Sequence, residues 1–133
     1  MKSEEKFKKF HEWLAKNGAK YPAVDYPVAF GKNGELVGLA AKKDIPPQKA
    51  FLFIPQCMII NELVCKKDPI CGPMYEKHPE IFKDHFDAEY LLMIVFVMHH
   101  MLIGEKSFWH PFWQIINMSD MPMRWSYYEV CEL

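Results

Sequence analysis

The chain has 133 residues, of which half are hydrophobic and 15% are aromatic, and this is enough apolar material for the core of one domain. Sixteen basic and seventeen acidic residues leave a net charge of -1, so we expect no nucleic-acid partner. The longest apolar run, residues 90–98, is far shorter than the roughly twenty residues that a membrane span needs, so we expect no membrane span.

The first eighteen residues predict an amphipathic helix. Ser3 is placed to cap it, acidic residues follow in the first turn, and Asn17-Gly18 is a typical stop signal. We expect its apolar face to dock on the rest of the fold, with a partner-binding helix as the alternative. That face consists of Phe7, Phe10, Trp13 and Leu14.

Residues 27–60 predict short β hairpins. Asn33-Gly34 lies between the apolar runs 28–30 and 36–41, and this dipeptide favours a tight hairpin turn because both positions tolerate a positive φ. Further short strands are predicted at 50–54 and 58–60.

Asn61 can cap a helical turn that extends to about Lys66. Residues 67–83 contain three prolines and a glycine, and we expect them to be irregular.

A helix is predicted over residues 84–103, with Asp84 or Asp87 as its cap and Gly104 at its end. It is apolar nearly all round, which predicts burial on most sides. Short strands cannot cover so much apolar surface, so further chain or a protein partner is expected to pack against it. Near its end, His99-His100 favours helix-end packing over a metal or acid–base role, because adjacent residues point about 100° apart.

An aromatic segment occupies residues 107–133. Its large side chains predict core packing, with a recognition surface as the alternative. His110 is expected to stack among them, and Ser126 with Glu129 forms a capping box that predicts the start of a helix. We interpret a helix beginning so near the last residue as truncation inside a larger fold. The aromatic residues are Phe108, Trp109, Phe112, Trp113 and Trp125.

The four cysteines show neither CxxC spacing nor a zinc-binding pattern, so no metal site is predicted. We expect reduced thiols in an intracellular protein, cytoplasmic or nuclear, because residues 1–6 contain acidic residues and no signal-peptide run. No residue is singled out as catalytic. The cysteines are Cys57, Cys65, Cys71 and Cys131.

Four motifs in order resemble the N-terminal part of the SET-domain family that includes the Rubisco large-subunit lysine methyltransferase and the actin histidine methyltransferase. The resemblance covers nearly all of residues 7–133 and implies an α+β fold: a single partial SET-like domain over 1–133, with short β hairpins and a long buried helix. The motifs are the WL and NG of residues 13–18, GLAAKKDI at 38–45, FIP with MII at 53–60, and SFWHPFW at 107–113 continued by MRW at 123–125.

The resemblance implies S-adenosylmethionine as the cofactor, held in part by the first hairpin at Gly38, Leu39 and Ala40. In the family, glycine lets the backbone approach the cofactor and an arginine can pair with a carboxylate. This chain departs at two positions: Leu36 replaces the first glycine and Ala40 replaces the arginine, whose charge Lys42 or a neighbouring lysine could replace in part.

The family's NH motif, its catalytic tyrosine and its substrate-binding domain have no counterpart in these residues. We therefore expect no activity from this chain alone, and a protein partner or completing chain is implied. Two hypotheses follow. The chain is part of a protein lysine or histidine N-methyltransferase, or it is a non-catalytic SET-like subunit or interaction module of a larger complex.

Overall fold

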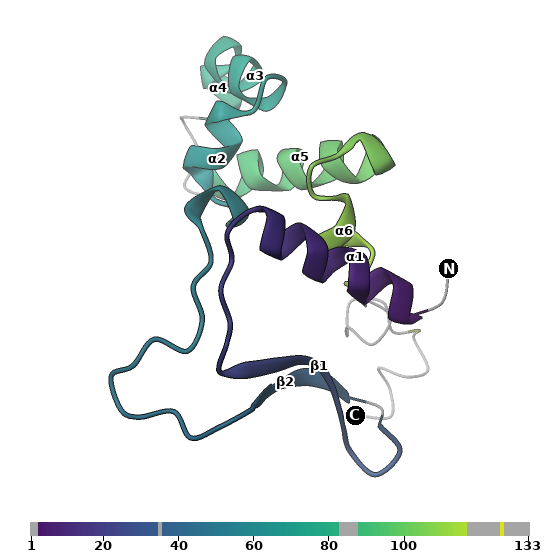
Figure 1. Ribbon diagram of the computed structural model, residues 1–133. Coiled ribbons are helices and arrows are strands. Elements are labelled where there is room, and N and C mark those ends of the chain that lie inside the picture. Colours follow the sequence, from purple (N-terminus) through teal and green to yellow (C-terminus); the bar gives the residue numbers. More distant parts are fainter. Residues whose placement is uncertain (1–2, 35, 83–87, 117–125, 127–133) are drawn as a thin grey trace.

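The computed structural model describes residues 3–34, 36–82, 88–116 and 126. These residues form helices and one two-stranded antiparallel sheet (Figure 1). None of the helices described is long and apolar enough to cross a membrane. The elements are α1 (Ser3–Lys16), β1 (Val24–Phe30), β2 (Leu36–Ala41), α2 (Glu62–Lys67), α3 (Cys71–Lys77), α4 (Pro79–Phe82), α5 (Ala88–Leu102) and α6 (His110–Trp113), with 3-10 turns η1 (Gln56–Met58) and η2 (Gly104–Lys106).

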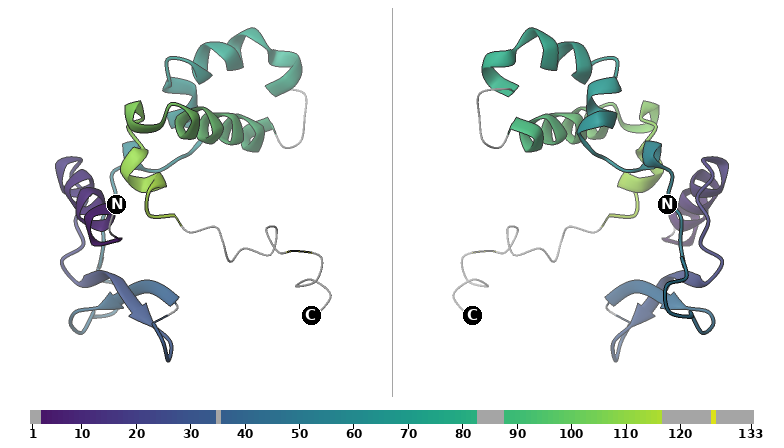
Figure 2. Two further views of the ribbon diagram at one scale, coloured as in Figure 1. Left: turned by 90° about the vertical axis from the view of Figure 1, so that its right-hand side faces the viewer. Right: turned by 90° about the vertical axis from the view of Figure 1, so that its left-hand side faces the viewer.

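The helices α2 to α5 gather at one end of the molecule and the hairpin lies at the other (Figures 1 and 2). Between them, α1 contacts both α6 and the hairpin. The ring of Phe10 lies 6.1 Å from that of Tyr26 on β1 and 6.4 Å from that of Phe112 on α6. The prediction that α1 docks through its apolar face is therefore confirmed, and Gly18 follows the helix with φ +85.

The predicted first hairpin is confirmed, with Phe30 opposite Leu36 and Val28 opposite Gly38. Its turn differs in detail from the expectation. Gly31 and Gly34 take positive φ, whereas the positive φ tolerated by Asn33 is not used. Two glycines in a longer loop therefore reverse the chain, instead of a tight two-residue turn.

The predicted strands at 50–54 and 58–60 are wrong. Phe53 forms only an isolated bridge with Lys20, and Met58 belongs to the 3-10 turn that follows Pro55. The physical reason is the lack of a partner strand, because β1 and β2 pair only with each other among the residues described. The β hairpins expected over residues 27–60 are therefore a single hairpin.

The predicted cap at Asn61 is confirmed, since its side-chain oxygen accepts a hydrogen bond of 3.1 Å from the N–H of Val64. The irregular segment predicted at 67–83 is wrong, because α3 and α4 occupy much of it. Its prolines are compatible with helices: Pro73 lies in the first turn of α3 and Pro79 begins α4, where no intrahelical N–H bond is lost.

The predicted helix at 84–103 is present as α5, and its expected caps, Asp84 and Asp87, lie outside the described residues. Leu92, Phe96 and His100 are buried on its inner side. The predicted burial on most sides is confirmed only in part. Leu91, Met93, Val95 and Val97 are partly buried against the core, whereas the outer side of α5 is exposed. The side chains of Tyr90, Ile94 and Met98 are each more than half exposed.

The aromatic segment contributes to the core, as predicted. Trp109 is buried against Phe96 of α5 and Trp13 of α1, with ring centroids 6.1 and 5.8 Å apart. Phe108, however, remains substantially exposed. Trp125 and the helix predicted after Ser126 lie outside the described residues. Trp109 thus packs between α1, α5 and α6.

Gly72 offers a test of this packing. A Cβ atom built there would overlap the backbone carbonyl oxygen of Lys66, which cannot swing away as a side chain can. We expect Gly72→Ala to lower the free energy of unfolding by about 3 kcal/mol in urea titrations followed by circular dichroism.

The matched control is Gly104→Ala. Gly104 has φ +56 and no heavy atom within 4 Å of a built Cβ, so only the left-handed backbone conformation opposes alanine, at a cost of about 1 kcal/mol. Equal losses in the two variants would contradict the described packing of α2 against α3.

Candidate functional site

The three residues predicted to contact a cofactor lie consecutively on β2. Because side chains alternate along a strand, Gly38 and Ala40 occupy one face and Leu39 the other. Gly38 and Ala40 are half-buried, whereas Leu39 is exposed. The hairpin therefore brings Gly38 and Ala40 to one surface and directs Leu39 away from it.

The space over Gly38 is occupied by an aromatic ring of the same hairpin. A Cβ built on Gly38 would lie 3.1 Å from Cε2 of Phe30, which is tighter than ordinary contact. The absence of a side chain at Gly38 therefore makes room for Phe30. A ligand that approaches the backbone of Gly38 on this face must first displace that ring, which is partly exposed at the end of β1.

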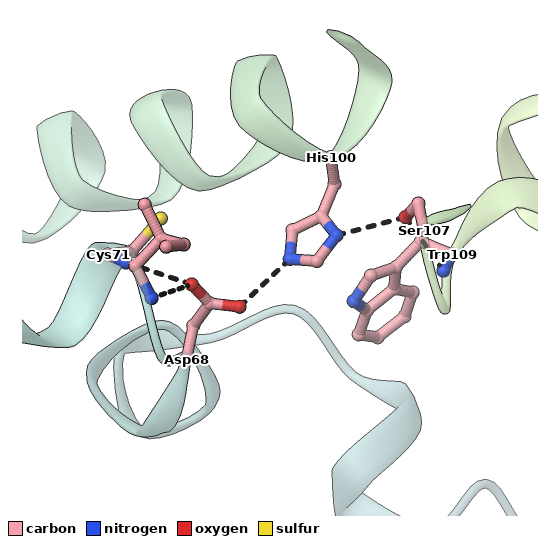
Figure 3. Close-up of polar contacts among 6 residues, drawn as sticks. Asp68, Cys71, His100, Ser107 and Trp109 are labelled. Carbon is pink, nitrogen blue, oxygen red and sulfur yellow. Dashed lines mark hydrogen bonds and ion pairs between the residues drawn. The ribbon is translucent and has the colours of Figure 1, made fainter. Parts of the chain in front are cut away.

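A second cluster, which the sequence did not predict, joins Asp68, His100 and Ser107 (Figure 3). The His100 imidazole lies between the other two: Nε2 is 3.1 Å from Oδ2 of Asp68, and Nδ1 is 2.9 Å from Oγ of Ser107. All three side chains are largely buried. The cluster brings together the loop after α2, the end of α5 and the loop before α6.

The remaining acceptor atoms of this cluster are also used. Asp68 Oδ1 accepts the N–H groups of Ile70 and Cys71 at the start of α3, and Ser107 Oγ accepts the N–H of Trp109 (Figure 3). Burial alone would raise the pKa of Asp68. The hydrogen bonds from Cys71, Ile70 and His100 outweigh it and hold that pKa below its ordinary value.

Hydrogen bonds link Ser107 to His100 and His100 to Asp68, as in a hydrolase triad. The environment of Ser107, however, does not suit nucleophilic attack. Ser107 is only 6% exposed, and its oxygen already accepts a backbone hydrogen bond. A cavity of about 240 Å³ lies beside the cluster and is lined by Asp68 and His100 but not by Ser107. The hydroxyl therefore does not face this cavity, and its hydrogen bonds, with those of His100, join three segments of the chain.

The burial of His100 near the end of α5 confirms the expected helix-end packing. Its hydrogen-bond partner Asp68 could not be predicted from the spacing of residues along the chain. Asp68 lies 32 residues earlier in the chain. The available signal was an aspartate two and three residues before Ile70 and Cys71, from where its side chain accepts their N–H groups. His11 and His110 lie elsewhere: the first bonds the hydroxyl of Tyr21 at 2.8 Å, and the second lines a separate cavity beside α6.

The thiols of Cys57, Cys65 and Cys71 are free, and Cys131 lies outside the described residues. Burial, followed by the negative charge of Asp68, raises the pKa of Cys65 to about 11 and that of Cys71 to about 12. Both thiols therefore stay protonated and unreactive near neutral pH. Across the described ranges, no three His, Cys, Asp or Glu side chains are arranged to hold a metal ion.

Comparison with known proteins adds no further residue to these sites. No protein-family model matches the chain, and no curated protein or solved structure matches it either. The two sites therefore rest on the geometry of the hairpin and of the Asp68 cluster alone.

Asp68→Asn tests the fastening role of the cluster. Asparagine keeps an oxygen that can accept the N–H groups of Ile70 and Cys71 but loses the charge-assisted bond to His100. We therefore expect the free energy of unfolding at pH 7 to fall by about 2 kcal/mol. Asp68 has a lower pKa in the folded chain than in the unfolded one. Its contribution is therefore complete above the unfolded value of about 3.9 and is lost as the pH falls through the folded value.

Urea titrations from pH 7 downward measure both effects, and the variant should show the shallower pH dependence below about pH 4. Asp25→Asn is the control, because Asp25 pairs with Lys42 on the surface and should contribute at most about 1 kcal/mol. If the two variants lose the same stability, Asp68 does not fasten these segments.

Proposed function

We propose that the chain forms the front part of a SET-domain protein N-methyltransferase, in which the β1–β2 hairpin is one wall of the S-adenosylmethionine site. The observation that carries this proposal is a two-stranded hairpin with Gly38 on β2 and with apolar residues open on both faces. A wall of this kind requires further polypeptide to cover it. We therefore expect methyl transfer only when that polypeptide is present.

The order of the four family-like motifs supports the proposal. The first lies on α1, the second begins on β2, the third includes the bridge at Phe53, and the fourth leads into α6. The fourth motif also packs on the first, since Trp109 contacts Trp13 across the core. Motifs distant in sequence thus contribute to one packed unit, as motifs of a single fold should.

The hairpin fits a cofactor in one respect and departs from the family in another. Gly38 leaves its backbone free of a side chain of its own, although Phe30 must move aside. Ala40 supplies no charge for the cofactor carboxylate, and Lys42 is already paired with Asp25 at 2.8 Å. Lys43, which is exposed, remains the neighbouring cation for that role.

S-adenosylmethionine, when bound, supplies an electrophilic methyl group to a lysine or histidine nitrogen. Transfer requires the acceptor nitrogen to be aligned with that methyl in a narrow channel from which water is excluded. The hairpin can orient the cofactor from one side and shield it from water. The completing polypeptide has to provide the acceptor channel, so the choice of substrate belongs to that part.

A specific observation favours a second candidate, a non-catalytic SET-like subunit. Phe30 covers Gly38, and Leu36 and Ala40 replace the family's glycine and arginine. In addition, the outer side of α5 presents Tyr90, Ile94 and Met98 at successive helical turns, which is a stripe suited to a protein partner.

Calorimetric titration of S-adenosylmethionine tests the enzyme proposal, using the chain together with the polypeptide that completes the domain. We expect saturable binding by the native protein and at least about tenfold weaker binding by Gly38→Val, because the added side chain fills the face that the cofactor approaches.

Ala41→Val is the matched control, because Ala41 lies on the opposite face of the same strand and its replacement should leave affinity unchanged. Circular dichroism checks that both variants fold. A completed, folded protein that takes up no S-adenosylmethionine would eliminate the enzyme proposal and leave the second candidate.

The second candidate predicts that the exposed stripe on α5 binds a hydrophobic dye. We expect the chain alone to enhance dye fluorescence, and Ile94→Lys with Met98→Lys to reduce the enhancement because they place charge on the stripe. A chain that unfolds cooperatively as a monomer and gives no dye signal would contradict the interaction role.

A further inference from the structure

The outer edge of β2 is an unpaired sheet edge within the described part of the chain. Among the residues that the structure describes, β2 pairs with β1 alone, so the backbone groups on its other edge have no strand beside them. An unpaired edge presents a row of N–H and C=O groups that matches the backbone of another extended strand. The hydrogen-bonding pattern of this edge therefore selects a β-strand as its partner.

The two edges of the sheet differ in how they are protected. β1 contains Asp25 and Pro27, and charge and proline are the usual means of blocking edge pairing. β2 has the sequence LVGLAA and contains neither. Strand addition is therefore disfavoured at the edge of β1 and allowed at the edge of β2.

Both faces of β2 are apolar and open at this edge. Leu36 is 63% exposed on one face, and Val37 and Leu39 are 57% and 48% exposed on the other. A strand added at this edge extends both faces of the sheet, so a partner with one polar face would place polar side chains beside these apolar residues. The best match is a strand that is apolar on both faces, and β2 itself has this property.

We propose that two copies of this chain associate by antiparallel pairing of their β2 strands, which forms a four-stranded sheet across a two-fold axis. Such pairing is self-complementary, because each residue of the strand meets a residue of the same strand in the other copy. The charges flanking β2 in the sequence are Lys32 and Glu35 before it and Lys42, Lys43 and Asp44 after it. They are balanced once the ion pair between Lys42 and Asp25 is counted. Antiparallel pairing therefore brings no excess of like charge together.

The dimer is expected to be weak. β2 has six residues, so the interface is small, and interfaces below about 1,200 Å² are typical of transient complexes. Self-association does not depend on the proposed methyltransferase role. A result that contradicts one of the two proposals therefore does not contradict the other.

Sedimentation velocity of the chain over low to high micromolar concentrations tests the proposal. We expect the average mass to rise toward twice the monomer mass. Hydrogen exchange measured by mass spectrometry should slow over residues 36–41 as the concentration increases, because pairing protects backbone amides. Leu39→Lys should raise the dissociation constant by at least about tenfold, since each change acts twice across the axis.

Leu63→Lys is the matched control. Leu63 lies on α2, is 55% exposed and carries the same side chain, but it is distant from the sheet edge. We expect its dissociation constant to equal that of the native chain. A monomer at every concentration, equal effects of the two lysine variants, or concentration-independent exchange over residues 36–41 would each overturn the proposal.

Discussion

The helical end of the molecule depends on one buried carboxylate. Asp68 accepts backbone hydrogen bonds at the start of α3 through one oxygen and the His100 imidazole through the other. A buried charge is costly unless it is paired and hydrogen-bonded, and here both conditions are met. The same histidine bonds Ser107, which in turn accepts the N–H of Trp109. Short helices that would be marginal alone are thus fixed around α5.

The hairpin has no comparable support. It is attached to α1 through Tyr26, whose ring meets Phe7 and Phe10, and Val24 at the start of β1 is buried, whereas β2 is largely exposed. Isolated two-stranded sheets are marginally stable in water, so a hairpin with apolar residues on both faces gains stability when another polypeptide covers it. The contrast between a fastened helical end and a largely exposed β2 strand is the basis for the proposal that the hairpin takes part in recognition.

The elements that the sequence predicted correctly are those with local causes. The apolar spacing of α1, the apolar runs on either side of the hairpin turn and the Asn61 cap act within a few residues. The failures have non-local causes. Strands at 50–54 and 58–60 needed partners that are not beside them, and α3 depends on Asp68, whose orientation is fixed by a histidine 32 residues away. Gly38 was placed on its strand correctly, but the ring of Phe30 over it depends on cross-strand packing.

We propose that the face of β2 carrying Gly38 is a cofactor wall once further polypeptide covers the hairpin. The most direct measurement is amide chemical-shift mapping of the completed protein with and without S-adenosylmethionine. We expect the largest shifts at Gly38, Leu39 and Ala40, together with changes at the Phe30 ring as it moves aside. Binding that leaves these residues unperturbed and shifts others would contradict this proposal.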